Sequence, residues 1–136
     1  MSRAWRPGWG DFPAPLSEFW TERHLCTLTT LRPDGTPHTV PVGVVLDDDE
    51  RCAWVITSRT SVKARHLHTP GPVAACQVDG RRWSTLEGVA VVASDEASVA
   101  RAVGKYAGRY RQPRPNPERV ALRIEVDRFL CSTGLV

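Results

Sequence analysis

Six stretches of the chain carry the apolar patterns of β-strands. The clearest is "VALRIEVDRFL" at 120–130, in which apolar residues alternate with charged ones such as Arg123 and Glu125. This period of two puts apolar side chains on one face of a strand and charged ones on the other. Three more runs are "CAWVIT" (52–57), "VAACQV" (73–78) and "RRWSTLEGVAVVAS" (81–94), and the remaining two lie within "LCTLTTLRPDGTPHTVPVGVVLDDD" (25–49).

Turn-forming residues separate these runs. Pro33-Asp34-Gly35 joins the first two into a hairpin, because Pro fixes φ and Gly accepts a positive φ. The acidic segment 47–50 and the pair Asp79-Gly80 predict two further turns. Gly88, inside the fifth run, predicts a β-bulge or a close backbone approach. Short turns of this kind favour antiparallel pairing of the strands.

Three segments predict helices. "PLSEFWTERH" (15–24) predicts a short helix with Ser17 as its N-cap, and residues 60–68 predict another that "TPGP" ends. Asp95 is the expected N-cap of the longest helix, which runs to about Tyr110. One face of that helix carries Val99, Val103, Tyr106 and Tyr110, and another carries the cations Arg101, Lys105 and Arg109.

These elements predict a mainly β, α+β fold. Six antiparallel strands with two to three helices are typical of a small six-stranded barrel that has helices at its ends. A chain of 136 residues, 41% of them hydrophobic, can build one core and not two. We therefore expect an N-terminal arm at 1–13, rich in Pro, Gly and Trp, and a single barrel domain at 14–136.

Composition and charge exclude several classes of protein. No run approaches ~18 consecutive apolar residues, which argues against a membrane span. The first twenty residues lack the apolar core of a secretory signal, so we expect a cytoplasmic protein. The net charge of +3 is small and the acidic residues are spread along the chain, which disfavours nucleic acid as a partner. The four cysteines lie far apart and are expected to stay reduced.

The sequence lacks the motifs of the common catalytic machineries. It contains no GxSxG, HExxH, Walker loop or GxGxxG. His66 and His68 are two residues apart, on different sides of a helix, so we expect surface histidines and no metal site. An enzyme with this sequence would take its chemistry from an organic cofactor, and no catalytic side chain can be named.

Hydroxyl and cationic side chains cluster where the third run gives way to a helix. The cluster comprises the hydroxyls of Thr57, Ser58, Thr60 and Ser61 and the cations Arg59, Lys63 and Arg65. Such groups suit an anion such as a phosphate. A helix cap flanked by solvated cations explains the same residues, so both interpretations stay open. The basic face of the longest helix is likewise typical of an exposed helix.

Three segments in this order and spacing resemble the pyridoxamine-phosphate-oxidase-like superfamily, whose fold is the FMN-binding split β-barrel. They are "LCTLTTLRPDGTPHTVPVGVVLDDD", "TSRTSVKARHL" and "RRWSTLEGVAVV". The resemblance covers about residues 22–133. With "CQVDGRRWSTLEG" and "RYRQPRPNPERV", the chain is most similar to the coenzyme F420-dependent branch, and within it to the biliverdin reductases.

The resemblance implies F420 as the cofactor, held at the interface of a homodimer. It implies hydride transfer from reduced F420 to a small conjugated acceptor, of which biliverdin, reduced to bilirubin, is the example. The implied site residues are Thr57, Ser58, Arg59, Ser61, Val62 and Lys63 for the phosphate; the backbone of His38, Val40, Pro41, Val42 and Gly43 for the deazaflavin ring; Gln77, Val78 and Trp83 near the ring or across the dimer; and Lys105 and Arg109 for the polyglutamate tail. For the acceptor's carboxylates the candidates are Arg109, Arg111 and Arg114, because they flank a stiff proline-rich link.

Pyridoxamine phosphate is not the expected substrate. Trp83 stands where the oxidases have a glutamine beside the ring, and their C-terminal extension has no counterpart here. Two alternatives remain open. One is an FMN-dependent oxidoreductase on the same barrel, and the other is a non-catalytic carrier of F420, flavin or haem.

Overall fold

The computed structural model describes residues 2–5, 9 and 12–135, which form one β-sheet and three α-helices. The strands are β1 (Ser2–Trp5), β2 (Cys26–Leu31), β3 (Pro37–Val42), β4 (Val45–Asp47), β5 (Cys52–Ser58), β6 (Gly71–Asp79), β7 (Arg82–Ala93) and β8 (Arg119–Ser132). The helices are α1 (Ala14–Thr21), α2 (Val62–His66) and α3 (Glu96–Arg109), followed at the C-terminal side by a 3-10 turn, η2 (Thr133–Leu135).

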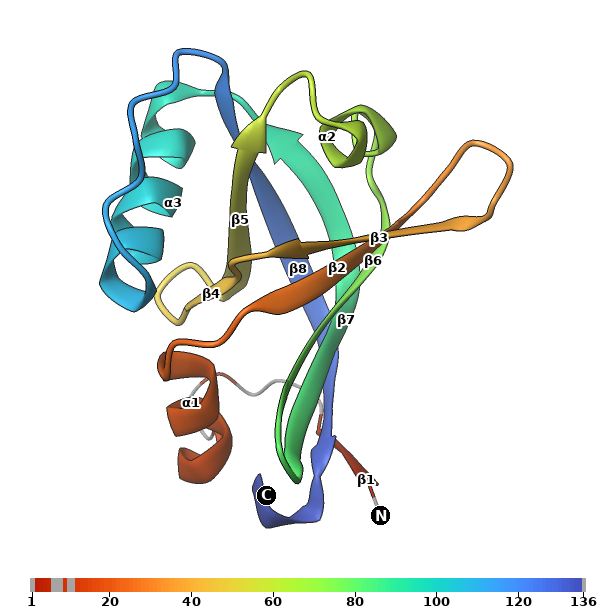
Figure 1. Ribbon diagram of the computed structural model, residues 1–136, viewed down its shortest axis with the longest axis vertical. Helices are drawn as coiled ribbons and strands as arrows, with labels where there is room; N and C mark the ends of the chain where they lie inside the picture. Colours follow the sequence, from red (N-terminus) through yellow and green to blue (C-terminus); the bar gives the residue numbers. More distant parts are fainter. Residues whose placement is uncertain (1, 6–8, 10–11, 136) are drawn as a thin grey trace.

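The sheet curls into a barrel, and its two edge strands follow one another in the chain. Its strands follow the order β3-β2-β6-β7-β8-β5-β4, with every neighbouring pair antiparallel, and β1 pairs with β8. β3 and β4 stand at opposite ends of this order but are separated in the chain by Gly43 and Val44 alone. In Figure 1 β4 follows β3 after a short bend. The prediction of a mainly β, antiparallel split barrel is confirmed.

The strand count differs from the predicted six. The expected second strand is divided at Gly43 and Val44 into β3 and β4. A Cβ at Gly43 would lie 2.7 Å from the ring of Tyr106 and 2.9 Å from that of Tyr110. The chain therefore bends where α3 presses on it. A further strand, β1, lies in the expected N-terminal arm. It pairs antiparallel with the end of β8, with Ser2 opposite Ser132.

The turn predictions are confirmed by backbone geometry. Gly35 and Gly80 adopt φ values of 85° and 61°, which favour glycine. Asp34 accepts hydrogen bonds from the backbone and hydroxyl of Thr36. The register of β7 against β8 shifts at Gly88, where a Cβ would lie 2.1 Å from the carbonyl oxygen of Glu125. Gly88 is thus the expected bulge and close approach.

The helix predictions hold except at the first N-cap. Asp95 caps α3 by accepting from the N–H of Ser98 at 3.0 Å, and α3 ends at Arg109, next to the expected end. The assignment of Ser17 as a cap is wrong, because α1 begins at Ala14 after Pro13 and contains Ser17. Proline in a first helical turn loses no hydrogen bond, so the helix starts earlier than Ser17 suggests.

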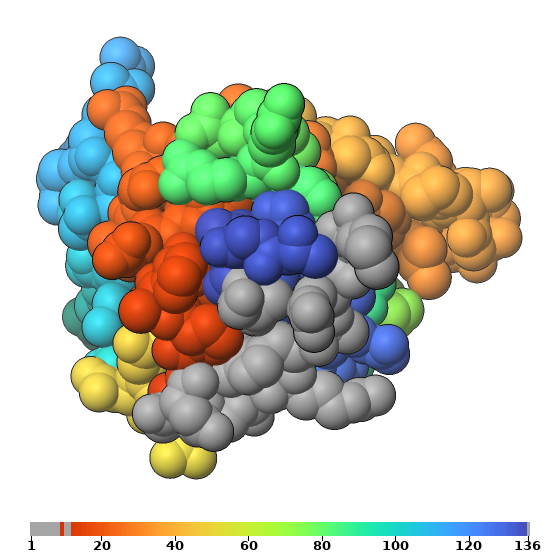
Figure 2. All heavy atoms as spheres, turned by 90° about the horizontal axis from the view of Figure 1, so that it is seen from below, coloured from red at the N-terminus to blue at the C-terminus, as the bar shows by residue number. Residues whose placement is uncertain are grey.

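The core fills the barrel and is closed at one end by α1. Leu16, Phe19 and Trp20 of α1 are buried together with strand residues and with Leu135 of η2. Seen from that end, α1, the β6–β7 turn and the C-terminal residues lie over the barrel (Figure 2). α2 lies at the opposite end, next to the projecting β2–β3 hairpin (Figure 1).

Two further expectations concern membranes and thiols. None of the helices in the described parts of the chain is long and apolar enough to cross a bilayer. Cys26, Cys52 and Cys76 are free thiols, and Cys26, Cys52 and Cys131 are buried.

Candidate functional site

The hydroxyl groups after β5 make several of the protein's own hydrogen bonds. Ser61 Oγ caps α2 by accepting from the N–H of Ala64 at 3.2 Å, and it also accepts from the hydroxyl of Thr57 at 3.0 Å. Ser58 Oγ accepts from Asn116 Nδ2 at 2.8 Å. The helix-cap interpretation is therefore correct for Ser61. Each hydroxyl still has bonding capacity left for a ligand.

The two cations of this corner differ in their partners. Arg59 is exposed and pairs with Glu118, its Nε lying 2.8 Å from the carboxylate. Lys63 is half-buried and makes no hydrogen bond or ion pair with any described residue. Burial lowers the pKa of Lys63, because the ammonium loses water without gaining an anion. Lys63 is thus the group of this corner that most needs an anion.

β3, the strand expected beneath the cofactor ring, lies at an edge of the sheet. Among the described strands it pairs only with β2, so every second residue turns its backbone polar groups away from the sheet. Pro37 and Pro41 lack an N–H and suit such an edge. His38 and Val40 are half-buried and Val42 is buried. The backbone of 38–42 can therefore offer hydrogen bonds to a ligand.

Two histidines meet where β3 passes α2. The ring centroids of His38 and His66 lie 5.4 Å apart, with the ring planes at 88°. His66 Nδ1 lies 2.8 Å from the hydroxyl of the buried Thr30. His38 Nδ1 is buried and has no hydrogen-bond partner within the described residues. The expectation of a surface His66 is wrong, since His66 is half-buried and joins α2 to β2 and β3.

The missing hydrogen bond of His38 Nδ1 lowers the stability of the fold. A buried polar atom without a hydrogen bond costs about 1–3 kcal/mol. Such a cost is removed when a ligand or water supplies the missing partner. β3 and α2 therefore each carry one unsatisfied group, His38 Nδ1 and the Lys63 ammonium.

Gly43, the last of the expected β3 residues, has a structural explanation. Its α-carbon faces Tyr106 and Tyr110 of α3 too closely for any side chain. This packing divides β3 from β4 and places Gly43 at the α3 side of the barrel rather than at the α2 corner.

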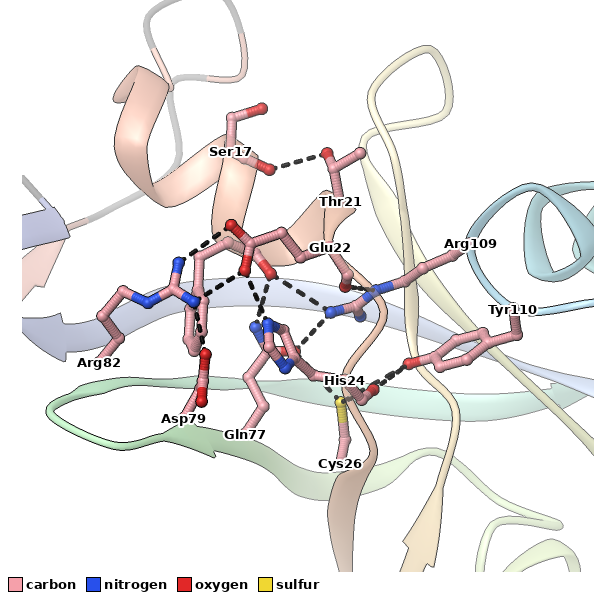
Figure 3. Close-up of polar contacts among 11 residues, drawn as sticks. Ser17, Thr21, Glu22, His24, Cys26, Gln77, Asp79, Arg82, Arg109 and Tyr110 are labelled. Atoms are coloured by element: carbon pink, nitrogen blue, oxygen red, sulfur yellow. Dashed lines mark hydrogen bonds and ion pairs between the residues drawn. The ribbon is translucent and has the colours of Figure 1, made fainter.

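Arg109, predicted to contact the cofactor tail and the acceptor, is buried, and its guanidinium lies among groups of the protein itself (Figure 3). Its guanidinium donates to the carbonyl of Glu22 at 2.8 Å, to that of Val44 at 2.5 Å and to Gln77 Oε1 at 2.7 Å. A weaker fourth bond of 3.4 Å reaches the carbonyl of Phe19. All of these acceptors belong to the protein, so Arg109 ties α3 to the rest of the fold.

Gln77 belongs to the same network rather than to an outer surface. It is 1% exposed and donates through Nε2 to the carbonyl of Phe19 at 3.0 Å. Cys26 Sγ donates to its Oε1 at 3.4 Å. The neighbouring Tyr110 donates to the carbonyl of His24 at 2.6 Å and accepts from the N–H of Val44 at 3.1 Å. Figure 3 shows these groups between α1, β2 and α3.

Arg101 and Lys105 of α3 face a buried carboxylate. Asp47 is fully buried and accepts from Arg101 Nε at 2.6 Å, from Arg101 Nη2 at 2.9 Å and from Trp54 Nε1 at 2.8 Å. Lys105 Nζ lies 3.8 Å from the same carboxylate. Burial alone would raise the pKa of Asp47, but the hydrogen bonds from Arg101, Trp54 and the Glu50 N–H outweigh it and hold that pKa well below its ordinary value.

The remaining predicted residues are spread over other surfaces. Val78 is 64% exposed and pairs in register with the half-buried Trp83 on the outer face of β6 and β7. Arg111 and Arg114 are exposed in the link after α3. The structure thus brings β3 beside α2 through His38 and His66, whereas Gln77, Arg109 and the C-terminal arginines lie on other elements.

Sequence reasoning missed the groups that the hairpin contributes to this corner. Arg32 follows β2, and with Arg65 and His66 of α2 it lines one cavity. The sequence around Arg65 and His66 does not indicate that Arg32 lies near them, because the cavity forms only when the β2–β3 hairpin packs beside α2.

Comparison with known proteins agrees with the barrel fold. The family model described as pyridoxamine 5′-phosphate oxidase matches residues 12–130. A relative from Mycobacterium tuberculosis, named F420H(2)-dependent biliverdin reductase, is 48% identical over 118 residues, which cover 87% of this chain and 86% of the relative.

Solved structures give the same fold. A conserved hypothetical protein from Mycobacterium tuberculosis superposes with a TM-score of 0.72 at 26% identity, covering 85% of this chain and 81% of that one. A structure named F420 reductase superposes with a TM-score of 0.66 at 21% identity, covering 83% and 94% of the two chains. At that identity the second likeness speaks for the fold alone.

Proposed function

We propose a function on the basis of family membership, since this chain belongs to the pyridoxamine 5′-phosphate oxidase family. The protein is an F420H2-dependent reductase that passes a hydride to a small conjugated acceptor. The observation that carries this proposal is the near-half identity to the mycobacterial F420H(2)-dependent biliverdin reductase, which extends over most of both chains.

The β3–α2 corner has the chemistry that F420 requires. Lys63 is a half-buried cation without a partner in the described chain, and a phosphodiester would supply its missing charge. Thr57 and Ser58 hold hydroxyls beside it, already positioned by Ser61 and Asn116. We therefore assign the cofactor's phosphate to this corner.

The free edge of β3 suits the polar edge of a deazaflavin ring. Backbone N–H and C=O groups between His38 and Val42 are rigid donors and acceptors. His38 Nδ1 adds a side-chain group whose hydrogen bond is unmade. When bound, reduced F420 supplies the hydride. These residues orient the ring.

A homodimer with the cofactor at its interface is the assembly we propose. Leu25 and Val78 are 70% and 64% exposed. Val78 pairs in register with the half-buried Trp83 on the outer face of β6 and β7. Exposed large apolar side chains of this kind are typical of a protein interface. The free thiols fit a reducing compartment, and we place the dimer in the cytoplasm.

Cofactor binding is the first test. The purified protein is stripped of ligand and titrated in parallel with F420 and with FMN. Tighter binding of F420, weakened in Lys63→Ala but not in the exposed Arg81→Ala, supports the proposal. Preferential binding of FMN would instead make the protein a flavin-dependent oxidoreductase.

The reaction is the second test. Protein, F420H2 and biliverdin are mixed without oxygen, and the absorbances of F420 and bilirubin are followed together. Equal consumption of F420H2 and formation of bilirubin supports a biliverdin reductase. Reduction of another conjugated acceptor with biliverdin untouched retains the cofactor and replaces the substrate. Binding of F420H2 with no acceptor reduced would make the protein a carrier.

A further inference from the structure

A cavity of about 470 Å³ lies between the β2–β3 hairpin, α2 and the start of β6. Its lining residues are Leu31, Arg32, Pro33, Val62, Arg65, His66, Leu67, His68, Thr69, Gly71 and Pro72. This volume is within the range of small-molecule sites. Lys63 and the hydroxyls of the proposed phosphate site do not line it, so it is a separate space beside α2.

The charged groups of the cavity are all cationic or imidazole. Among the described residues that line it there is no Asp or Glu. The Arg65 guanidinium has no hydrogen-bond or ion-pair partner in the described chain, and that of Arg32 donates to the carbonyl of Pro37 through one nitrogen. Both arginines therefore have N–H groups available to an anion.

The pKa of His66 also reflects the positive charge around the cavity. Burial lowers the pKa of His66, and the nearby His38, Arg32 and Arg65 lower it further. Its Nδ1 is engaged with Thr30, which leaves Nε2 as the ring atom free to meet a ligand. His68 Nδ1 donates to the carbonyl of Arg65 at 2.8 Å, so His68 supports the turn after α2.

The walls of the cavity are apolar. Leu31 and Val62 are large hydrophobic side chains that stay 42% and 38% exposed at its sides. Pro33, Leu67 and Pro72 add further apolar surface. An apolar slot with arginines at its rim complements a flat apolar molecule that ends in a carboxylate.

We propose that this cavity binds the carboxylate-bearing end of the acceptor, with Arg32 and Arg65 as the specificity-determining residues. The contact of His66 with His38 joins the cavity to the free edge of β3, so an acceptor held here can extend towards the proposed ring site. This inference rests on the proposed function for the identity of the ligand as the acceptor. The position of the carboxylate contact rests on the cavity alone.

The test compares biliverdin with its dimethyl ester, which has the same body without the carboxylates. Binding of each to the F420-free protein is measured by the change in bilin absorbance. The wild type is expected to bind biliverdin about tenfold more tightly, because charge-assisted hydrogen bonds are roughly twice as strong as neutral ones. In the Arg32→Gln/Arg65→Gln variant that preference should vanish. The Arg23→Gln/Arg81→Gln variant, exposed arginines away from the cavity, should keep it.

Three results would overturn the proposal. They are equal binding of the two bilins by the wild type, a preference that survives in Arg32→Gln/Arg65→Gln, and a preference lost instead in Arg111→Gln/Arg114→Gln. F420 is titrated into the same variants. Normal F420 binding by Arg32→Gln/Arg65→Gln shows that the fold and cofactor site are intact. A bilin preference without any F420 binding would keep the cavity assignment and remove the proposed function.

Discussion

The α3 side and the α2 side of the barrel treat positive charge in opposite ways. Beside α3, Arg109 donates to buried carbonyls and Arg101 to the buried Asp47. Beside α2, Lys63 and Arg65 have no hydrogen-bond or ion-pair partner in the described part of the chain. Burying a charge without a counter-charge costs free energy, so folding does not explain Lys63. The difference separates cations that hold the fold from cations that remain available to an anion.

The acceptors of Arg109 explain why it is structural. Phe19 lies in the last turn of α1 and Glu22 follows it, where helical carbonyls lack intrahelical partners. Val44 lies between β3 and β4, outside the ladder of either strand. One guanidinium therefore satisfies carbonyls that regular secondary structure leaves unpaired. α2 presents no comparable set to Lys63.

The largest expected effect is on stability, from Arg109→Met. The change removes the charge-assisted hydrogen bonds from the buried guanidinium to Glu22, Val44 and Gln77, each worth about 1.5–3 kcal/mol, so we expect a loss of roughly 3 kcal/mol or more in the free energy of unfolding. Urea unfolding measures it, with the exposed Arg81→Met as the control. If the Arg109→Met protein is stable but binds long-tailed F420 poorly, Arg109 contacts the cofactor tail and is not a structural residue.

Asp47→Asn should have the next largest effect. It removes the charged acceptor of Arg101 inside the fold, and we expect a loss of about 2–3 kcal/mol at neutral pH. Because the folded pKa of Asp47 is lowered, its contribution is present above the unfolded value of about 4 and is lost as the pH falls below it. Urea unfolding across that range should show the two proteins converging in acid. Asp48→Asn, at an exposed neighbour, should match the wild type throughout.

Lys63→Ala tests the other half of the comparison. It should weaken F420 binding about tenfold to a hundredfold, the value of one or two charge-assisted hydrogen bonds, while leaving unfolding little changed. The pKa of Lys63 is lowered in the free protein, so F420 affinity should fall as the pH rises through it, and the variant should lack this dependence. A large loss of stability with unchanged F420 affinity would make Lys63 a structural cation.

The smallest expected effect is that of Lys105→Glu on the cofactor tail. Lys105 is partly exposed but already lies 3.8 Å from Asp47, so its charge is partly compensated. We expect about a threefold loss for long-tailed F420 and none for the tail-less form, a difference that added salt should remove. Lys105→Gln should give a smaller loss of the same kind. Equal losses for both forms of the cofactor would exclude a tail contact.

Much of the fold could be predicted because its signals are local. The turns at Gly35 and Gly80, the bulge at Gly88 and the cap at Asp95 each depend on a few neighbouring residues. Their side chains or lack of them fix the backbone directly. The division of β3 from β4 could not be predicted, because it depends on tyrosines more than sixty residues away that meet Gly43 only in the folded barrel.

The burial of Arg109 shows how a pattern can mislead. Grouping it with Arg101 and Lys105 uses the i, i+4 spacing, but an α-helix turns every 3.6 residues, so that spacing drifts around the helix. Arg109 is seven residues, nearly two turns, after the buried Ala102 and shares its face. Attention to Ala102 would have indicated an inward Arg109.

The candidate site was predicted in part for the same reason. Thr57, Ser61 and Lys63 lie in one short segment, so the sequence itself brings them together. The contact of His66 with Thr30 and His38, and the cavity that Arg32 shares with Arg65, require a hairpin and a helix that are distant in the chain. Such groupings follow from sheet topology, which single residues do not encode.

The anchoring of Val44 bears on how proteins of this shape diversify. Arg109 and Tyr110 fix Val44, and the hairpin beyond it projects from the body of the barrel (Figure 1). Replacing or lengthening residues 32–36 would therefore change the wall of the cavity while β2 keeps its register with β6 and α3 keeps its packing. A lineage could acquire a new acceptor by exchanging this exposed loop, and an engineer could graft one from a relative, without redesigning the core.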